Sequence, residues 1–289
     1  MSLSSRTFRL LRYFEEKNLN PVTLSVQDAI EYKAAIAEHI TKNGNRVSAG
    51  TCCNSLKAAR SLFNYIAASG KRGSNPFLAV PYPRLGEHFS RNFLSEAEMN
   101  LLLSNLRHFK DSEGYRVHVL SELLYSTGLR ISEAASLFYE DIDIPQRLVH
   151  VQHGKGGVNR TAFLTGYAAA VLYHYKKRGR QAVINMYRGK RKKGDNLFCV
   201  DYSRLQDSVN MALKKTCTKL ELPVITSHGF RHSLGTHLLR SGCDMRHIQI
   251  ILGHKKLETT QVYTHVDKDD VKASLDMYHP RRCIKECRP

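Results

Sequence analysis

The chain has 289 residues, of which 42 % are hydrophobic, and its 44 Lys and Arg against 26 Asp and Glu give a formal charge of +18. The length predicts two domains, and the hydrophobic content is too high for an intrinsically disordered chain. The charge indicates a polyanionic partner, with nucleic acid as the first candidate and an acidic membrane surface as the second. No apolar run approaches the roughly 18 residues that span a bilayer, and we find no signal peptide, so we expect a cytoplasmic protein.

The seven cysteines are an odd number and include no Cys-x-x-Cys pair. A disulfide framework is therefore not expected, and the pattern fits a reducing compartment. Cys283 and Cys287 could form a ligand pair or a redox pair, but ordinary free thiols are the simpler interpretation.

Residues 1–75 are predicted to form a helical domain, because apolar residues recur at helical spacing in three stretches. Ser25, followed by Asp28 in the first turn, is a typical start for the second helix. The three predicted apolar faces consist of Phe8, Leu11 and Phe14, then of Val26, Ile30, Ala34 and Ala37, and then of Cys53, Leu56, Leu62, Phe63 and Ile66.

Residues 76–92 are predicted to be an interdomain linker. The segment contains Pro76, Pro81 and Pro83, three of the eight prolines in the chain. Proline lacks a backbone N–H and favours extended geometry in the residue before it, so no helix is expected to run through this stretch.

The helical pattern resumes at Leu94, where Ser95 and Glu98 have the spacing of a capping box. One long helix is expected to break at residues 126–128, and the next to begin near Arg130 and to extend to Phe138. Residues 147–164 instead alternate with a period of two around a glycine-rich turn at 154–157, which predicts a hairpin. Helices follow, so the fold class is mainly α with a small β-element.

A run of basic residues between positions 176 and 193 contains no acidic residue. A solvated helix face is the ordinary explanation for such a run, whereas contact with nucleic-acid phosphates suits a chain with this overall charge. The nine residues of this basic run are Lys176, Lys177, Arg178, Arg180, Arg188, Lys190, Arg191, Lys192 and Lys193.

His228 and Arg231 are three residues apart, so on a helix their side chains lie one turn apart on nearly the same side. Ser227 is a candidate cap for that helix. An imidazole and a guanidinium at a helix N-terminus suit an anion such as a phosphate, although His-x-x-Arg also occurs by chance.

Four segments together resemble the tyrosine recombinases of the phage integrase family, which include the Xer resolvases. They are residues 127–133 (TGLRISE), 154–156 with Arg160 (GKG…R), 228–232 (HGFRH), and 252–254 with 259–265 (LGH…TTQVYTH). They occur in the family's order, and the resemblance covers residues 94–279. It implies a two-domain DNA clamp, with a helical core-DNA-binding domain at 1–75, the linker at 76–92, and a mixed α/β, mostly helical catalytic domain at 93–289.

The resemblance also implies how DNA would be cut. Tyr263 would attack the scissile phosphate, forming a 3′-phosphotyrosyl bond and releasing a 5′-hydroxyl. Lys155 would be the general acid for the leaving oxygen, and His228 would take part in proton transfer at the tyrosine.

Three further residues would act on the phosphate itself. Arg130 and Arg231 would hold its non-bridging oxygens, and His254 would add a hydrogen bond there. Glu133, one turn after Arg130, would orient the basic groups. The resemblance implies no metal, cofactor or ATP.

The implied partner is double-stranded DNA with inverted-repeat-like sites, bound by a tetramer across two sites in the nucleoid. The tail after Tyr263 predicts a short helix whose apolar stripe is Val271, Leu275 and Tyr278. This helix is too short to be stable alone in water, so its stripe must dock on the chain's own domain or, as the resemblance implies, on a neighbouring protomer.

Three alternatives remain open from the sequence. His228 and His232 form a His-x-x-x-His pattern that could bind zinc, although Gly229 stands where metalloproteases carry a glutamate. A catalytically silent DNA-binding protein and a type IB topoisomerase would use the same fold or chemistry. Residues 160–164 lack the Val-Pro-Leu ending common in the family, and the biological role could be chromosome-dimer resolution or the integration and excision of a mobile element.

Overall fold

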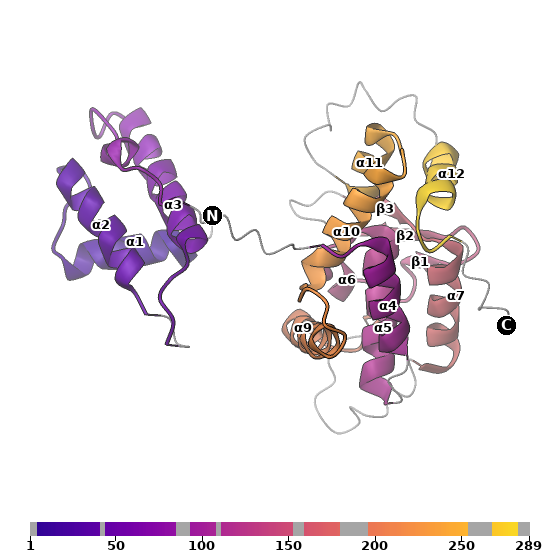
Figure 1. The fold of residues 1–289 in the computed structure, drawn as a ribbon. Coiled ribbons are helices and arrows are strands. Elements are labelled where there is room, and N and C mark those ends of the chain that lie inside the picture. Colours follow the sequence, from indigo (N-terminus) through magenta and orange to yellow (C-terminus); the bar gives the residue numbers. More distant parts are fainter. Residues whose placement is uncertain are drawn as a thin grey trace. The chain divides into compact units, whose positions relative to one another are not determined.

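The computed structural model describes residues 5–40, 44–84, 93–107, 111–152, 159–179, 196–253 and 268–282. The chain divides into two compact units, Met1–Phe89 and Ser90–Pro289, which are described separately (Figure 1). The mainly helical fold class agrees with the expectation from the sequence.

In its described residues the first unit has three α-helices and one short 3-10 helix around an aromatic core. Rings from each helix pack edge to face or tilted against one another, with Phe14 and Tyr32 among them and Phe63 and Phe77 only 5.0 Å apart between centroids. The elements are α1 (Ser5–Glu16), α2 (Val26–Glu38), α3 (Ala49–Ala68) and η1 (Pro76–Ala79).

The predicted face of the first helix is partly wrong and that of the second is wrong. Phe8 is 64 % exposed, and Val26 and Ile30 are each 43 % exposed. Phe14 is buried as predicted and packs with Leu10 of α1, whereas the packed side chains of α2 are Ala29, Tyr32 and Ile36. The large Tyr32 ring packs among the core aromatics and fixes the rotation of α2 about its axis. A count of apolar positions takes no account of the size of this ring.

The start of the predicted linker belongs to the core of the first unit. Phe77 and Val80 are buried there, and Arg60 of α3 donates hydrogen bonds to both of their carbonyl oxygens, at 3.0 and 2.6 Å. Pro76 opens a 3-10 helix, where its missing N–H leaves no donor unpaired. Of the expected 76–92 linker, residues 85–92 lie outside the described part of the chain.

The second unit packs most of its helices around α5, which is buried along almost its whole length. A small antiparallel sheet of order β1-β2-β3 lies beside them (Figure 1). The helices are α4 (Glu96–Arg107), α5 (Ser112–Thr127), α6 (Ile131–Ala135), α7 (Gly166–His174), the π-helical turn η2 (Tyr175–Gly179), α9 (Tyr202–Lys219), α10 (Ser227–Arg240), α11 (Met245–Leu252) and α12 (Lys268–Tyr278).

The predicted hairpin is confirmed. Strands β2 (Leu148–Val151) and β3 (Arg160–Phe163) pair antiparallel, with Val149 opposite Ala162. A short strand, β1 (Ile142–Asp143), extends the sheet and was not predicted. The glycine-rich turn at 154–157 lies outside the described residues.

The predicted helix from Arg130 to Phe138 is shorter than expected. Helix α6 ends at Ala135, and Phe138 is 48 % exposed and forms an isolated β-bridge with Asn196. The chain turns away here because the Leu137 carbonyl accepts a hydrogen bond from Leu197 N, at 2.7 Å. Because this backbone pairing joins segments that lie far apart along the chain, the residues around the end of α6 do not reveal it.

The tail helix α12 docks on its own unit in this single chain. Val271 and Leu275 are buried in the core of the second unit, and α12 packs against α11. Just beyond it, His279 and Arg281 are also buried, and Arg281 forms an ion pair with Glu122 of α5. Tail docking on the same unit, one of the two expected modes, is therefore the arrangement of the isolated protomer.

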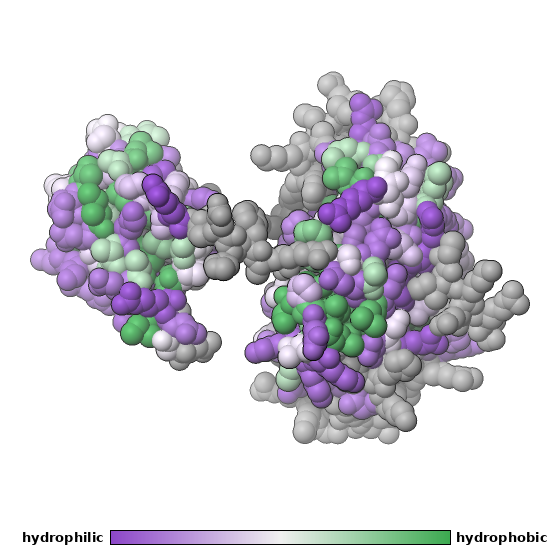
Figure 2. Space-filling model, in the orientation of Figure 1, coloured by the Kyte–Doolittle hydropathy of each residue, from purple (hydrophilic) through white to green (hydrophobic). Residues whose placement is uncertain are grey.

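Hydrophilic residues occupy much of the viewed face of each unit, with smaller hydrophobic areas between them (Figure 2). None of the described helices combines the length and the apolarity needed to cross a membrane. The cysteines at positions 52, 53, 199, 217 and 243 are buried thiols, while Cys283 and Cys287 lie outside the described residues.

Candidate active site

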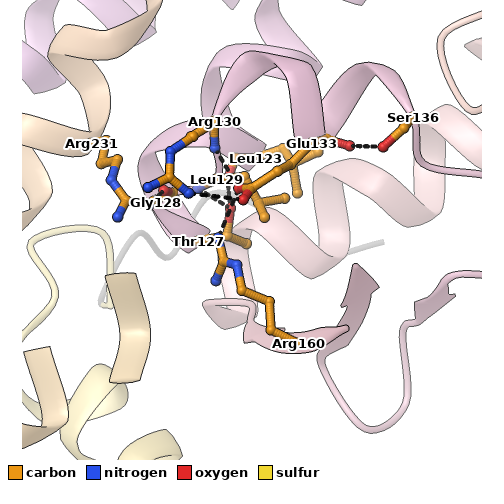
Figure 3. Close-up of polar contacts among 9 residues, drawn as sticks. All are labelled: Leu123, Thr127, Gly128, Leu129, Arg130, Glu133, Ser136, Arg160 and Arg231. Carbon is orange, nitrogen blue, oxygen red and sulfur yellow. Dashed lines mark hydrogen bonds and ion pairs between the residues drawn. The ribbon is translucent and has the colours of Figure 1, made fainter. Parts of the chain in front are cut away.

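The end of α5 presents Arg130 to the site. The helix stops at Gly128, which has φ of 62° and is the left-handed residue that caps it. Two residues later, Arg130 is the N-cap of α6, with extended backbone. Glu133 accepts a hydrogen bond from the Arg130 backbone N–H at 2.8 Å and another from Arg130 Nη1 at 3.0 Å (Figure 3). The carboxylate thus fixes both the start of α6 and the direction of the guanidinium.

Glu133 is held by a second arginine, from the sheet. Arg160 Nη2 donates to Glu133 Oε2 at 2.9 Å, and the Glu133 side chain is only 4 % exposed. Burial acts to raise the pKa of Glu133, but the charges of Arg160 and Arg130 and their hydrogen bonds outweigh it, and the pKa lies below its usual value. Glu133 is therefore an anion at neutral pH.

Arg231 enters the site from α10 and is buried, with a residue exposure of 6 %. Its Nη1 donates to the carbonyl oxygen of Gly128 at 2.6 Å (Figure 3). Among the described residues its Nη2 is buried without a hydrogen-bond partner. Burial and the nearby charges of Arg130 and Arg160 lower the pKa of Arg231 to about 10, which leaves the group protonated at neutral pH.

His228 lies one turn before Arg231 in the first turn of α10, as the spacing predicted. Its side chain is exposed. Partial desolvation of the ring lowers its pKa, and the charges of Arg231, His232 and Arg130 lower it further. The ring is therefore mostly neutral at neutral pH and is able to accept a proton.

The start of α10 differs from the sequence expectation in one detail. Ser227 is not the cap but the first helical residue, and the N-cap is Thr226, which makes no side-chain capping bond. The Ser227 backbone N–H instead donates to Asn210 Oδ1 of α9, at 2.9 Å. A side chain from another helix thus satisfies a donor that the sequence assigned to a local cap.

Two glycines of the recognised segments lie where neighbouring side chains leave little room for a Cβ atom. A Cβ atom at Gly128 would come within 2.7 Å of Leu252 Cδ2 and 3.2 Å of Leu234 Cδ2. Gly253 has φ of +65°, and a Cβ atom there would lie 2.8 Å from Arg160 Cδ. Glycine at these positions lets α10 and α11 pack against the end of α5, and lets Arg160 of β3 pack against the end of α11.

Three predicted catalytic residues lie outside the described residues. Lys155 belongs to residues 153–158, between β2 and β3. His254 and Tyr263 belong to residues 254–267, between α11 and α12. The described part of the predicted site is therefore Arg130, Glu133, His228 and Arg231. The structure adds Arg160 to them, a residue to which the sequence analysis gave no role.

The basic run is described only at its beginning. Lys176 Nζ lies 3.5 Å from the centroid of the Tyr139 ring, and Lys177 Nζ lies 5.1 Å from that of Tyr173. Burial lowers the pKa of Lys176. The side chain of Arg178 and all residues of 180–195 are outside the described part, including Arg180, Arg188, Lys190, Arg191, Lys192 and Lys193.

Zinc at the His228 and His232 pair would need a further ligand, and two histidines nearby in the sequence, His237 and His247, have other partners. His237 bonds Tyr125 Oη at 2.7 Å and the Leu94 carbonyl at 2.8 Å, and His247 bonds Ser274 Oγ at 2.7 Å. In the described ranges no three His, Cys, Asp or Glu side chains are grouped as metal ligands. Because a zinc site needs at least three protein ligands, the geometry of the described residues does not favour this alternative.

Residues 92–270 match the model of the phage integrase family. The chain belongs to the phage integrase family. It is 29 % identical to tyrosine recombinase XerC 2 of Ralstonia nicotianae over 283 residues, covering 96 % of this chain and 79 % of that protein. It is 31 % identical to tyrosine recombinase XerC of Bacillus subtilis over 242 residues, covering 81 % of this chain and 76 % of that one. The resemblance found in the sequence is thus confirmed, and the protein is an Xer-like tyrosine recombinase.

A solved structure shows the same fold. The Tn1549 transposon integrase, in complex with transposon right end DNA, matches with a TM-score of 0.67 and 22 % sequence identity, over 94 % of this chain and 91 % of that one. The mostly helical fold with a small sheet is therefore that of a tyrosine recombinase.

Proposed function

We propose that the protein is a site-specific DNA recombinase that cleaves and rejoins strands through a covalent bond between DNA and Tyr263. The observation that carries the proposal is the cluster of Arg130 and Arg231 at the end of α5, where Arg231 Nη2 is buried with no acceptor among the described residues. A tetrahedral anion with several oxygens is the ligand that suits such guanidinium donors, and a DNA phosphodiester is one. The family membership supplies the chemistry.

In the proposed reaction the Tyr263 oxygen forms a bond to phosphorus while the bond from phosphorus to the 5′-oxygen breaks. The phenolic proton passes to His228, and Lys155 donates a proton to the departing 5′-oxygen, so charge and protons balance. An ordinary phenol has a pKa near 10 and is a poor nucleophile at neutral pH, so it needs nearby cations and a base. His228, with its lowered pKa, is suited to be that base.

Arg130 and Arg231 stabilise the negative charge that builds on the non-bridging oxygens in the transition state. The pKa of about 10 keeps Arg231 charged throughout. Glu133 holds the Arg130 guanidinium by the 3.0 Å bond, and His254 adds a hydrogen bond to the phosphate. Because the phosphotyrosine keeps the energy of the phosphodiester, a different strand can be joined without ATP.

The partner in this proposal is double-stranded DNA with inverted-repeat-like sites, and the protein acts on it in the nucleoid. The formal charge of +18 gives the attraction to the phosphate backbone. The basic run at 176–193 contributes backbone contacts. The amino-terminal unit, together with the larger unit, forms a clamp around the duplex.

We further propose that four protomers assemble on two sites and exchange their tails. An α12 helix that docks on its own unit through Val271 and Leu275 can dock identically on a second copy, as in domain swapping. Truncation after Val266 is then expected to abolish cooperative assembly on a two-site DNA while leaving cleavage of a single half-site. A truncated protein that forms the four-protomer complex with full cooperativity would refute the exchange.

The covalent step is tested by Tyr263→Phe, with Tyr202→Phe as the control because Tyr202 is an exposed tyrosine of the same unit. DNA trapped covalently on the wild-type protein in cells is sequenced to define a site, and a duplex of that site nicked near the cleavage point is the substrate. Tyr263→Phe should bind this duplex without forming an adduct on a denaturing gel, whereas Tyr202→Phe should form it. An adduct formed by Tyr263→Phe at the wild-type rate would remove Tyr263 from the role.

A further inference from the structure

Arg160 lies where three segments of the proposed site meet. It is the first residue of β3, and its guanidinium bonds Glu133 of α6 (Figure 3). Its side chain also lies against Gly253 at the end of α11. The hairpin that β3 closes contains Lys155, and His254 follows Gly253 in the sequence. One side chain therefore connects three segments that each supply a proposed catalytic residue.

The connection to Arg130 runs through a shared carboxylate. Glu133 Oε2 accepts from both the Arg130 backbone N–H, at 2.8 Å, and Arg160 Nη2, at 2.9 Å, while Oε1 accepts from Arg130 Nη1 at 3.0 Å. The bond from Arg160 holds the Glu133 carboxylate in the orientation in which both of its oxygens accept hydrogen bonds from Arg130. Loss of Arg160 would free Glu133 to rotate and would take the Arg130 guanidinium with it.

The contact with Gly253 is equally close. A Cβ atom at this position would lie 2.8 Å from Arg160 Cδ and 2.9 Å from Cζ and Nε, so Gly253 is in close contact with the Arg160 side chain. The left-handed conformation, with φ of +65°, ends α11 at this point. The Arg160 side chain is thus part of the surface that fixes where α11 ends and where the segment with His254 and Tyr263 begins.

A purely structural role explains Arg160 poorly. Its side chain is 16 % exposed, and its Nε and Nη1 are buried without hydrogen-bond partners among the described residues. Burying donors without acceptors is unfavourable, so these two groups offset part of what the ion pair with Glu133 contributes to stability. Burial lowers the pKa of Arg231, and the charges of Arg130 and Arg160 beside it add to this effect. The net stabilisation from Arg160 is therefore small, and its charge is better explained by what it does for Arg130.

We propose that Arg160 is a positioning residue for strand cleavage, which aligns Arg130 through Glu133 and fixes the end of α11 through Gly253. The proposal rests on the proposed function, because the readout is DNA cleavage. Since displacement of a reacting group by about 1 Å can slow a reaction roughly 10²-fold, loss of the alignment is expected to slow cleavage by about that factor.

The test compares Arg160→Met, Arg160→Lys and the double variant Arg160→Met/Glu133→Gln. Single-turnover cleavage of the nicked duplex is measured at a temperature where circular dichroism shows every variant folded. Arg160→Met should cleave about 10²-fold more slowly while binding the duplex within about threefold of wild type. Arg160→Lys keeps the charge beside Glu133 and should cleave at least about tenfold faster than Arg160→Met.

The double variant separates positioning from structure. Replacing both members of the pair should return the melting temperature toward the wild-type value, because no buried carboxylate is left without Arg160. Cleavage should remain at or below the level of Arg160→Met if Arg160 acts by alignment, because Arg130 has then also lost the carboxylate that holds it. Recovery of cleavage together with stability would overturn the proposal, as would wild-type cleavage by Arg160→Met.

Arg116→Met is the matched control, since Arg116 is a buried arginine that pairs with Glu113 at 3.1 Å near the opposite end of α5. It should lose stability but should cleave within about threefold of wild type under the same conditions. If Arg116→Met slows cleavage as much as Arg160→Met does, the effect of Arg160 is one of stability alone. Failure of the wild-type protein itself to form any adduct would instead count against the proposed function.

Discussion

Substituting Gly128 by alanine tests whether the recognised segments are packed as tightly as the structure places them. Alanine in the left-handed region costs about 1–2 kcal/mol. The added Cβ atom would also lie 2.7 Å from Leu252 Cδ2 and 3.2 Å from Leu234 Cδ2, and overpacking of this kind costs about 1–3 kcal/mol. We therefore expect Gly128→Ala to lower the free energy of unfolding of the second unit by about 2–5 kcal/mol.

Gly242→Ala is the matched control, because Gly242 also has a positive φ, of +87°, but a Cβ atom at this position would meet nothing within 4 Å among the described residues. It should lose only the backbone part, about 1–2 kcal/mol. Urea unfolding followed by circular dichroism measures both variants, and the difference between them reports the packing part. Equal losses would show that α5, α10 and α11 are not in tight contact at Gly128.

The same substitution should affect cleavage, because the Gly128 carbonyl accepts the 2.6 Å hydrogen bond from Arg231 Nη1. A backbone shift at Gly128 moves this anchor, and the guanidinium moves with it. We expect Gly128→Ala to slow single-turnover cleavage by at least about tenfold, and Gly242→Ala to leave it within about threefold. Wild-type cleavage by Gly128→Ala would refute this coupling.

Three further outcomes are expected. Cleavage should proceed in EDTA, since the proposed cations are side chains, and a complete loss that only zinc restores would favour a metalloenzyme. Replacing the four basic residues at 190–193 with Gln should reduce the slope of DNA affinity against salt concentration, because fewer counterions are released, and an unchanged slope would make them a solvated surface. Burial lowers the pKa of His118 to about 4 and that of His279 to about 3. An unfolded His titrates near 6.5, so the unfolded chain binds more protons below that pH. Stability present at pH 7 should therefore be lost on acidification, at up to about 1.4 kcal/mol per pH unit for each ring, and a urea midpoint that stays constant from about pH 7.5 to about pH 5 would contradict this.

Features that depend on neighbouring residues could be predicted from the sequence. Helix α2 starts after Ser25 with Asp28 in its first turn, as expected, and the Asp28 N–H donates to Ser25 Oγ at 3.1 Å. The bonds between Ser95 and Glu98 form likewise. The hairpin follows from its alternation of residues. Each of these patterns lies within a few residues of the chain, where local geometry leaves few alternatives.

Features that depend on distant contacts could not be predicted. The exposed face of α2 carries Val26 and Ile30, which a periodicity count favours, but the Tyr32 ring packs among the core aromatics and sets the helix rotation. Residues 76–80 read as a linker because of Pro76 and Pro81, yet the side chain of Arg60 holds them in the core of the first unit. In both cases a partner from another helix decides the outcome.

The same division holds for the site. Arg130, Glu133 and Arg231 were found because they stand within recognised segments, and the hydrogen bonds of Glu133 show how two of them are joined. Arg160 also stands within a recognised segment, but it received no role because its partner Glu133 is 27 residues away, and no spacing rule connects a strand residue to a helix at that separation. The need for glycine at position 253 likewise becomes apparent only when the Arg160 side chain is seen against it.

The electrostatics of the site explain why a phosphate would bind where like charges repel one another in the free protein. Arg130, Arg160 and Arg231 bring three positive charges to one region, and Glu133 compensates only one of them. The remaining repulsion is part of why the pKa of Arg231 falls to about 10. A phosphate relieves this repulsion more when its oxygens carry more negative charge, as they do in the transition state. In the proposed reaction the arrangement would therefore stabilise the pentavalent phosphate, which carries more negative charge on its non-bridging oxygens, over the phosphodiester of the bound substrate.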